Sequence, residues 1–456
     1  MKIESIDKIY FLGIGGIGMS AIARHMQSIG KSVYGYDKTE TKLTKLLVEQ
    51  GMEIHYKDDP TMIPEDIDMV IYTPAIPDNL LEVLYFRSNG YKLIKRAELL
   101  GMLSNESKTI AIAGTHGKTS TSATVTHLLK SGGVDISAFV GGIMNNYNNN
   151  YIHGKGEWII VEADEYDRSF LHLSPDIAAV MSMDADHLDI YGDHSEMIEG
   201  FESFLGNVRD NGLIILKTEI INILSGNLKR DLENRGVTIL EFGINEHADL
   251  AISNILVKEG SFYFDIDNMV NVKTILPGRH NIENTAVAIK IASELGLNEK
   301  AIRIGLDSFR GIVRRFEYVI KTKDTVYIDD YAHHPTELRA AIDAAKELYP
   351  NRQIIGIFQP HLFSRTRDFV DGFADALGLL DEVVLLDIYP AREEPIPGVT
   401  SKLIYDKIKI KQKSLVEKST LLDVLKTKKI EILMTLGAGD IGAMVNNIKE
   451  IIINKQ

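Results

Sequence analysis

One glycine-rich segment constrains the fold of this chain more than any other: Ala113-Gly114-Thr115-His116-Gly117-Lys118-Thr119-Ser120. It follows an apolar, strand-like run (109–113) and opens a helix-like one (121–130). Such a turn predicts a phosphate-binding loop, because its backbone N–H groups point at the ligand and its lysine reaches the terminal phosphates. Thr119 stands where a hydroxyl usually ligates nucleotide-bound Mg²⁺. The alternative, an ordinary glycine-rich turn, requires neither the lysine nor the hydroxyl.

The loop is a variant of the full pattern G-x-x-x-x-G-K-[ST], whose first glycine would fall at Ile112.

The 456-residue chain is long enough for about three domains of ~150 residues. Its net charge of −14 disfavours nucleic-acid and anionic-membrane partners, which need a basic surface. It has no cysteine, which excludes disulfides and thiolate catalysis and fits a reducing compartment. With no signal-like start and no apolar run near ~20 residues, we expect a cytoplasmic enzyme with no membrane partner.

Apolar runs alternate with amphipathic stretches almost throughout, which predicts an α/β fold with mainly parallel sheets. Boundaries in the polar stretch 104–107 and near residue 310 predict domains at 1–107, 108–310 and 311–456. Short alternating strands near 249–257, 261–266 and 272–276 predict an antiparallel excursion within the second domain. We interpret the asparagine-rich stretch 145–150 as a solvated loop, with a substrate-binding loop as the alternative.

A second glycine-rich turn follows the first predicted strand: Gly13-Ile14-Gly15-Gly16-Ile17-Gly18. Its G-x-G-x-x-G spacing allows the backbone to approach a diphosphate at a helix N-terminus. Asp37 ends the next strand, 19 residues past Gly18, where dinucleotide-binding folds keep a ribose-binding acid. The turn is therefore compatible with NAD or with a nucleotide-sugar diphosphate, and a purely structural turn is the alternative.

Polar side chains also follow later strands. Glu162 is the first acid after the strand 158–161, where a second Mg²⁺ ligand is expected, whereas the acids after it are equally consistent with a solvated turn. His187 lies among carboxylates after another strand, which suggests a metal or phosphate role in place of an ordinary structural histidine. Asn281 and Asn284 share one face at a helix start and suit the edge of an adenine, although either could instead cap the helix.

Taken together, these motifs resemble the Mur ligases. The matching segments span nearly the whole chain in the family's order: 13–20, 114–119, 162–165, 186–189, 280–284, 314–316, 329–335 and 389–395. The resemblance implies a Rossmann-like N-terminal domain that holds a UDP-sugar and a central P-loop ATPase domain. It further implies a C-terminal Rossmann-like domain that closes over ATP and admits an amino acid.

The resemblance also implies a role for individual residues. The implied assignments are Lys118 to the terminal phosphates; Thr119, Glu162 and His187 to Mg²⁺; Asn281 and Asn284 to adenine; Asp330 to the ATP ribose; Arg315 to the phosphoryl group being transferred; and His333 and Arg365 to the incoming amino acid. The catalytic set is therefore Lys118, His187, Arg315, His333 and Arg365. Binding of the UDP-sugar is assigned to Gly13, Gly15, Gly16 and Gly18. The uridine would be contacted by Asp37 or by the turn 72–76, which contains Thr73.

The implied reaction is ATP-dependent ligation of L-alanine to the lactyl carboxylate of UDP-N-acetylmuramate through an acyl phosphate, a step of peptidoglycan precursor synthesis. Relatives that add later amino acids usually carry a carbamylated lysine downstream of the Asp-His motif. This chain has no lysine between Lys155 and Lys217, which favours the alanine-adding branch. Leu362 stands where many relatives carry arginine, so the contact of that arginine with the amino acid cannot be assigned to this position.

Three other functions are weaker interpretations of the same residues. An NAD-dependent dehydrogenase leaves the loop at 114–120 unexplained, and a folylpolyglutamate-type ligase leaves the N-terminal glycine turn unexplained. A nucleotide-gated binding protein without chemistry does not account for the ordered metal and adenine motifs.

Overall fold

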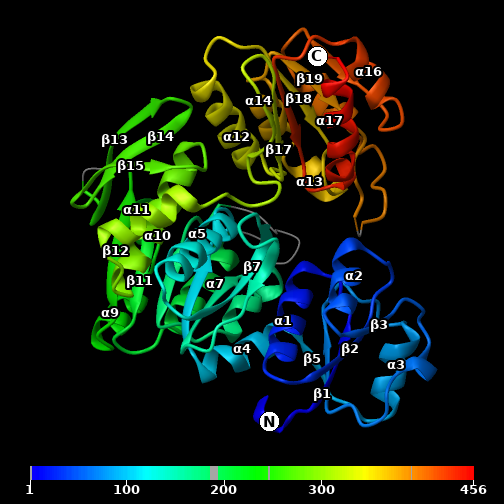
Figure 1. Cartoon of the computed structure of the whole chain (residues 1–456), viewed down its shortest axis with the longest axis vertical. Helices are drawn as coiled ribbons and strands as arrows, with labels where there is room; N and C mark the ends of the chain where they lie inside the picture. The colour runs from blue at the N-terminus through cyan, green and yellow to red at the C-terminus, as the bar shows by residue number, and fades with distance from the viewer. Residues whose placement is uncertain (1–2, 185–193, 245–246, 392, 456) are drawn as a thin grey trace. The chain divides into compact units, whose positions relative to one another are not determined.

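A computed structural model describes residues 3–184, 194–244, 247–391 and 393–455 (Figure 1). It contains three β-sheets of five, ten and six strands with helices between the strands, so the predicted α/β class is confirmed. The chain divides into two compact units. The first comprises Met1–Ser253, Ile266–Val270 and Glu283–Phe309, and the second comprises Asn254–Asp265, Asn271–Ile282 and Arg310–Gln456.

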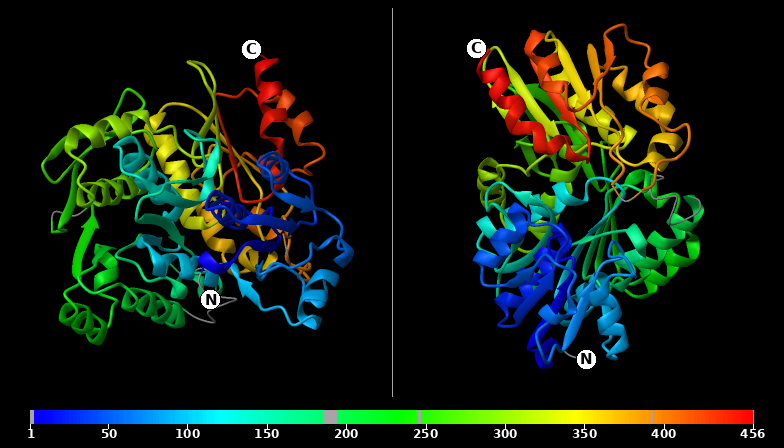
Figure 2. Two further views of the ribbon diagram at one scale, coloured as in Figure 1. Left: turned by 60° about the horizontal axis from the view of Figure 1, so that its bottom comes forward. Right: turned by 90° about the vertical axis from the view of Figure 1, so that its right-hand side faces the viewer.

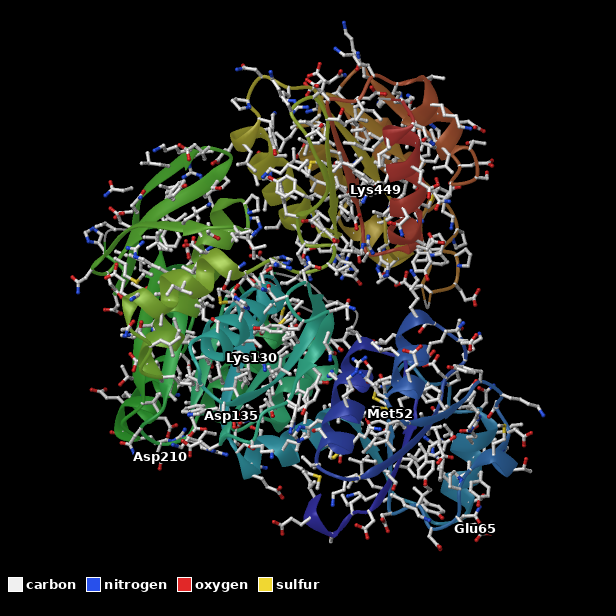
Figure 3. The ribbon with its side chains drawn as sticks, viewed as in Figure 1. Met52, Glu65, Lys130, Asp135, Asp210 and Lys449 are labelled. Atoms are coloured by element: carbon white, nitrogen blue, oxygen red, sulfur yellow. The ribbon has the colours of Figure 1, made fainter. Side chains whose placement is uncertain are left out.

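The five-stranded sheet of the first unit is entirely parallel, in the order β3-β2-β1-β4-β5. Its elements are η1 (Ile3–Ser5), β1 (Lys8–Leu12), α1 (Ile17–Ser28), β2 (Ser32–Tyr36), α2 (Lys42–Glu49), β3 (Glu53–His55), η2 (Pro60–Met62), β4 (Met69–Tyr72), α3 (Leu81–Ser88), β5 (Leu93–Lys95) and α4 (Arg96–Glu106). Both faces of β1 are buried, as expected for a central parallel strand. Met52 belongs to this core, whereas Glu65 lies at the surface (Figure 3).

One buried carboxylate stands out in this domain. Glu82 of α3 is fully buried and accepts a 2.7 Å hydrogen bond from the hydroxyl of Tyr10, which also lies 2.7 Å from Nε2 of His55. Burial raises the pKa of Glu82 from 4.5 to about 7. The folded protein therefore favours protonated Glu82, and the stability that this gives is present below pH 4.5 and lost as the pH rises through 7.

We expect Glu82→Gln to remove that pH dependence, because the amide is a neutral substitute for the protonated acid. Between pH 5 and pH 8 the wild-type protein should lose on the order of 2–3 kcal/mol relative to the variant, measured by urea unfolding at both pH values. Glu65→Gln, at the surface of the same domain, is the matched control. An equal pH response of the wild type and Glu82→Gln would contradict the prediction.

The ten-stranded sheet has the order β15-β14-β13-β12-β11-β10-β6-β9-β7-β8. Its strands are β6 (Lys108–Ala113), β7 (Ile136–Met144), β8 (Asn149–Ile152), β9 (Trp158–Ala163), β10 (Ile177–Val180), β11 (Leu213–Lys217), β12 (Thr238–Gly243), β13 (Leu250–Lys258), β14 (Ser261–Ile266) and β15 (Met269–Thr274). The associated helices are α5 (Lys118–Ser131), η3 (Tyr166–His172), α7 (His194–Gly206), α8 (Thr218–Ile221), α9 (Gly226–Asn234), α10 (Arg279–Glu294) and α11 (Glu299–Ser308). The two-residue turns that join β13, β14 and β15 require antiparallel strands, as predicted.

The interpretation of residues 145–150 as a solvated loop is wrong for its last two residues, which begin β8. Asn150 is fully buried: its Nδ2 donates to the carbonyl oxygen of Ile17 at 2.6 Å, and its Oδ1 accepts from Nη1 of Arg24 at 2.6 Å. The prediction of a loop rested on the asparagine-rich composition alone. The Asn150 amide can be buried because α1 supplies partners for its hydrogen bonds.

The six-stranded sheet of the second unit has the order β16-β17-β21-β18-β19-β20, with only the β16–β17 pair antiparallel. Its elements are β16 (Glu317–Lys321), β17 (Val326–Asp330), α12 (Pro335–Leu348), β18 (Ile354–Phe358), α13 (Phe363–Asp368), α14 (Val370–Leu377), β19 (Glu382–Leu385), α15 (Lys402–Lys407), β20 (Lys413–Leu415), α16 (Leu421–Thr427), β21 (Ile432–Leu436), η4 (Asp440–Met444) and α17 (Val445–Ile453). Helices cover both faces of the sheet, with α17 in red on one side in Figure 2.

Among the described helices, none is both long and apolar enough to span a bilayer.

Candidate active site

The segment 114–117 forms a tight turn between β6 and α5, as the sequence predicts. Gly114 (φ +127°) and Gly117 (φ +86°) have backbone conformations that suit glycine. A Cβ atom at Gly114 would lie 2.8 Å from the backbone nitrogen of Ser182, and one at Gly117 would lie 2.7 Å from Oδ1 of Asn284. The Ser182 hydroxyl accepts a 2.8 Å hydrogen bond from the N–H of His116 and so anchors the turn. Ser182 was not predicted, and its one weak signal in the sequence is its position just after a strand.

Lys118 begins α5 and lies in a dense set of acceptors. Its Nζ donates to the carbonyl oxygen of Gly114 at 2.6 Å and to the two carboxylate oxygens of Glu165 at 2.9 and 2.6 Å. Burial opposes the charged lysine, but nearby carboxylates, Glu165 first, outweigh it and raise the pKa of Lys118. Glu165 is fully buried, so the solvated-turn alternative does not describe this acid.

Thr119 and Glu162 lie together beside the lysine. Oγ1 of Thr119 donates to Oε2 of Glu162 at 3.1 Å, and the other carboxylate oxygen accepts from the N–H of Gly141 at 2.5 Å. A hydroxyl and a carboxylate are oxygen ligands of the kind that Mg²⁺ prefers, so this pair fits the ion. His187, the third predicted metal ligand, lies outside the described residues.

A pocket of about 390 Å³ in the first unit connects the two glycine-rich turns. Its lining includes Gly16, Ile17, Gly18, Met19, Thr73, Arg96, Lys118, Glu162 and Asp164. The guanidinium of Arg96 lies 3.5 Å from the carboxylate of Asp164, and a Cβ atom at Gly18 would lie 2.9 Å from Nη1 of Arg96. Arg96 was not predicted, because its only signal in the sequence is a basic residue at the start of a helix. The pocket places the predicted sugar-nucleotide turn beside the predicted ATP loop.

Asp37 faces the N-terminal turn, as its spacing predicts. Its Oδ2 accepts a 2.7 Å hydrogen bond from the N–H of Gly15, and a Cβ atom at Gly15 would lie 2.7 Å from the same oxygen. Gly13 has a φ of +82°, and its N–H donates to the carbonyl oxygen of Tyr36 at the end of β2. These glycines close the turn against β2 and Asp37, and a uridine contact of Asp37 stays a prediction.

The two asparagines proposed for adenine lie on the first turns of α10. Nδ2 of Asn281 donates to the carbonyl oxygen of Pro277 at 2.7 Å, while Asn284 lies against Gly117 of the phosphate loop. Glu283, between them, pairs with Lys217 at the end of β11 at 3.0 Å. Asn284 is thus next to the phosphate loop, and the adenine contacts stay predictions.

In the second unit, Asp330 ends β17 and is 9% exposed. Its two carboxylate oxygens accept from the N–H groups of Phe316 and Ala332, each at 2.7 Å, and burial raises its pKa to about 6. Arg315 stacks over the ring of Tyr331 at 5.2 Å. Asp330 therefore braces the segment that carries Arg315, and its ribose contact stays a prediction.

His333 follows the end of β17 and Arg365 lies beyond the end of β18, and β21 separates these two strands in the sheet. His333 is 3.2 Å from Glu337 and its ring is 6.0 Å from that of His361, whereas Arg365 is buried in α13. Leu362 precedes that helix with φ +72° and ψ 139°, a strained conformation for a residue other than glycine. The strained residue falls at the position where the sequence departs from the family pattern.

The parallel α/β framework, the phosphate loop with its lysine and the adjoining Thr119–Glu162 pair define a nucleotide-binding enzyme with a second glycine-rich turn. Three stretches of the chain match known families: 8–108 the Mur ligase family, catalytic domain; 112–292 the Mur ligase middle domain; and 314–441 the Mur ligase, glutamate ligase domain. The chain belongs to the Mur ligase family, whose members are ATP-dependent ligases. The exact domain boundaries at 107 and 310 stay predictions.

Individual relatives match over their full length. A UDP-N-acetylmuramate–L-alanine ligase of Flavobacterium johnsoniae is 46% identical over 461 residues, covering 99% of each chain. One from Porphyromonas gingivalis is 44% identical over 98% of this chain and 99% of its own. The crystal structure of UDP-N-acetylmuramate-alanine ligase from Thermotoga maritima aligns with a TM-score of 0.81 at 30% identity, over 98% of this chain and 100% of that one.

Proposed function

We propose that this chain joins L-alanine to the lactyl carboxylate of UDP-N-acetylmuramate, with ATP as phosphoryl donor and ADP and phosphate as products. The observation that carries the proposal is the pocket in which the N-terminal glycine turn and Lys118 meet. A substrate diphosphate held at that turn would place the rest of the molecule towards the phosphate loop. The full-length relatives named UDP-N-acetylmuramate–L-alanine ligase support the same substrates.

The proposed chemistry has two steps. First, a lactyl carboxylate oxygen attacks the γ-phosphorus of ATP, and the bond from that phosphorus to the leaving ADP oxygen breaks. Carboxylate and phosphate are both anions, so cationic Lys118 and Arg96 in the pocket lower their repulsion. Second, the alanine amine attacks the acyl carbon, the carbon–oxygen bond to phosphate breaks, and the nitrogen loses a proton.

We assign Mg²⁺ to Thr119 and Glu162, with His187 as a further ligand taken from the family motif. The support for this assignment is the oxygen donor pair, 3.1 Å apart beside the phosphate-loop lysine. When bound, the ion would neutralise phosphate charge. We assign Arg315 to the transferred phosphoryl group and His333 and Arg365 to the amino acid, on the family motifs alone.

The test is phosphate release with UDP-N-acetylmuramate and ATP over a panel of amino acids. We expect L-alanine to give the highest kcat/KM, with serine and glycine as weaker substrates, and no sustained ADP release when either the UDP-sugar or the amino acid is omitted. Steady ATP hydrolysis without them would indicate a different ATPase, and a preference for another amino acid would contradict the assignment of alanine.

A further inference from the structure

The ammonium of Lys118 has as many acceptors as it has N–H donors. A lysine carries three N–H groups and no acceptor. The structure gives Nζ three oxygen partners within 2.9 Å: one from Gly114 and two from Glu165. A phosphate oxygen that accepts from Lys118 must therefore take the place of one of them, or share its proton.

Of these acceptors, the carboxylate is the one that phosphate would replace. The carbonyl oxygen of Gly114 belongs to a turn that packs closely against the backbone of Ser182. Glu165 contacts Lys118 through its side chain and carries a negative charge, so it repels a polyphosphate that approaches the same ammonium.

The turn that carries Glu165 has an unusual backbone. Asp167 and Arg168, just after it, adopt successive φ values of 53° and 54°, which cost free energy in residues other than glycine. Ion pairs brace both residues, from Asp167 to Lys95 at 2.7 Å and from Arg168 to Glu196 at 3.1 Å. Such strain persists where the surrounding structure holds the residues in that conformation. Here it occurs in the turn that places the carboxylate of Glu165 against Lys118.

We propose that Glu165 is the positioning residue of the phosphate-loop lysine: its carboxylate holds the ammonium of Lys118 in the pocket and exchanges for a phosphate oxygen when a nucleotide binds. The inference rests on the proposed function in that Lys118 receives the phosphates. Its consequence is that Glu165 weakens nucleotide affinity while it fixes the position of the lysine.

The test is calorimetric binding of ADP to the full-length protein and to Glu165→Gln. We expect Glu165→Gln to lower the Kd for ADP by about tenfold, because a neutral amide competes less strongly for an ammonium than a carboxylate does. In the Lys118→Ala background the same substitution should change the Kd less than twofold. A purely structural role of Glu165 predicts weaker binding, so the direction of the change is diagnostic.

Glu157→Gln is the matched control, since it removes a carboxylate from an exposed ion pair with Lys108, just before β9, and neither residue lines the pocket. It should leave the Kd for ADP unchanged. Should Glu165→Gln fail to fold, Glu165→Asp keeps the charge but shortens its reach, and ADP should bind two- to fivefold more tightly.

Two negative results are distinguishable. Unchanged or weaker ADP binding by a folded Glu165 variant, or an equal gain without Lys118, overturns the exchange and leaves the proposed function in place. Failure of the wild-type protein to bind ADP contradicts the proposed function itself.

Discussion

Replacing Lys118 with alanine should lower ADP formation by at least ~10²–10³-fold while leaving UDP-N-acetylmuramate binding within about twofold of wild type. The ammonium lies at the start of α5, in the pocket where the proposed reaction brings a carboxylate and a phosphate together. Its loss removes the positive charge that would stabilise the transferring phosphoryl group. In the proposed function, the UDP-sugar is bound mainly by the separate turn at 13–18. Single-turnover ADP release and calorimetry with UDP-N-acetylmuramate measure the two effects independently.

Lys130→Ala is the matched control, because it removes the same residue type from the last turn of the same helix (Figure 3). Its side chain lies 5.8 Å from the ring of Tyr147, away from the residues that line the pocket. Its kcat should equal that of wild type. Full turnover by Lys118→Ala would refute the assignment of the phosphate loop.

Asn150→Leu should lower the free energy of unfolding by about 3 kcal/mol. The substitution removes the acceptor of a buried arginine, Arg24, and the donor to the carbonyl oxygen of Ile17. Each buried polar group left without a partner costs about 1–3 kcal/mol, and leucine offers neither with a replacement. Because Ile17 begins α1, the same change should also weaken UDP-N-acetylmuramate binding.

Urea unfolding measures the change in stability, with Asn148→Gly as the control. Asn148 is exposed and has a φ of 48°, which glycine adopts readily, so that variant should stay within about 0.5 kcal/mol of wild type. Wild-type stability of Asn150→Leu would show that the amide does not join α1 to β8.

Features that depend on local spacing were predictable from the sequence. The turn between β6 and α5 requires glycines, a lysine and a hydroxyl at consecutive positions, and the structure has them where the motif places them. The fold class followed in the same way from alternating apolar runs. The pairing of Thr119 with Glu162 was predictable because both lie at the carboxyl edge of adjacent parallel strands.

Features that depend on distant partners were not predictable. Glu165 looks like any acid of a polar turn until the chain brings it back to Lys118, 47 residues away in sequence. Asn150 sits in a run whose composition indicates a loop, and only its hydrogen bonds to α1 reveal a buried strand residue. The position of Arg96 in the pocket likewise depends on a distant residue, Gly18, whose lack of a side chain leaves space for the guanidinium.

The most direct test of the central claim is transfer of oxygen from the lactyl carboxylate to phosphate. UDP-N-acetylmuramate labelled with ¹⁸O in that carboxylate is incubated with ATP, Mg²⁺ and L-alanine, and the phosphate is analysed by mass spectrometry. Acyl phosphate formation predicts that each phosphate carries a labelled oxygen and that the product gains the mass of an alanyl residue. Unlabelled phosphate, or label without an alanylated product, would contradict it.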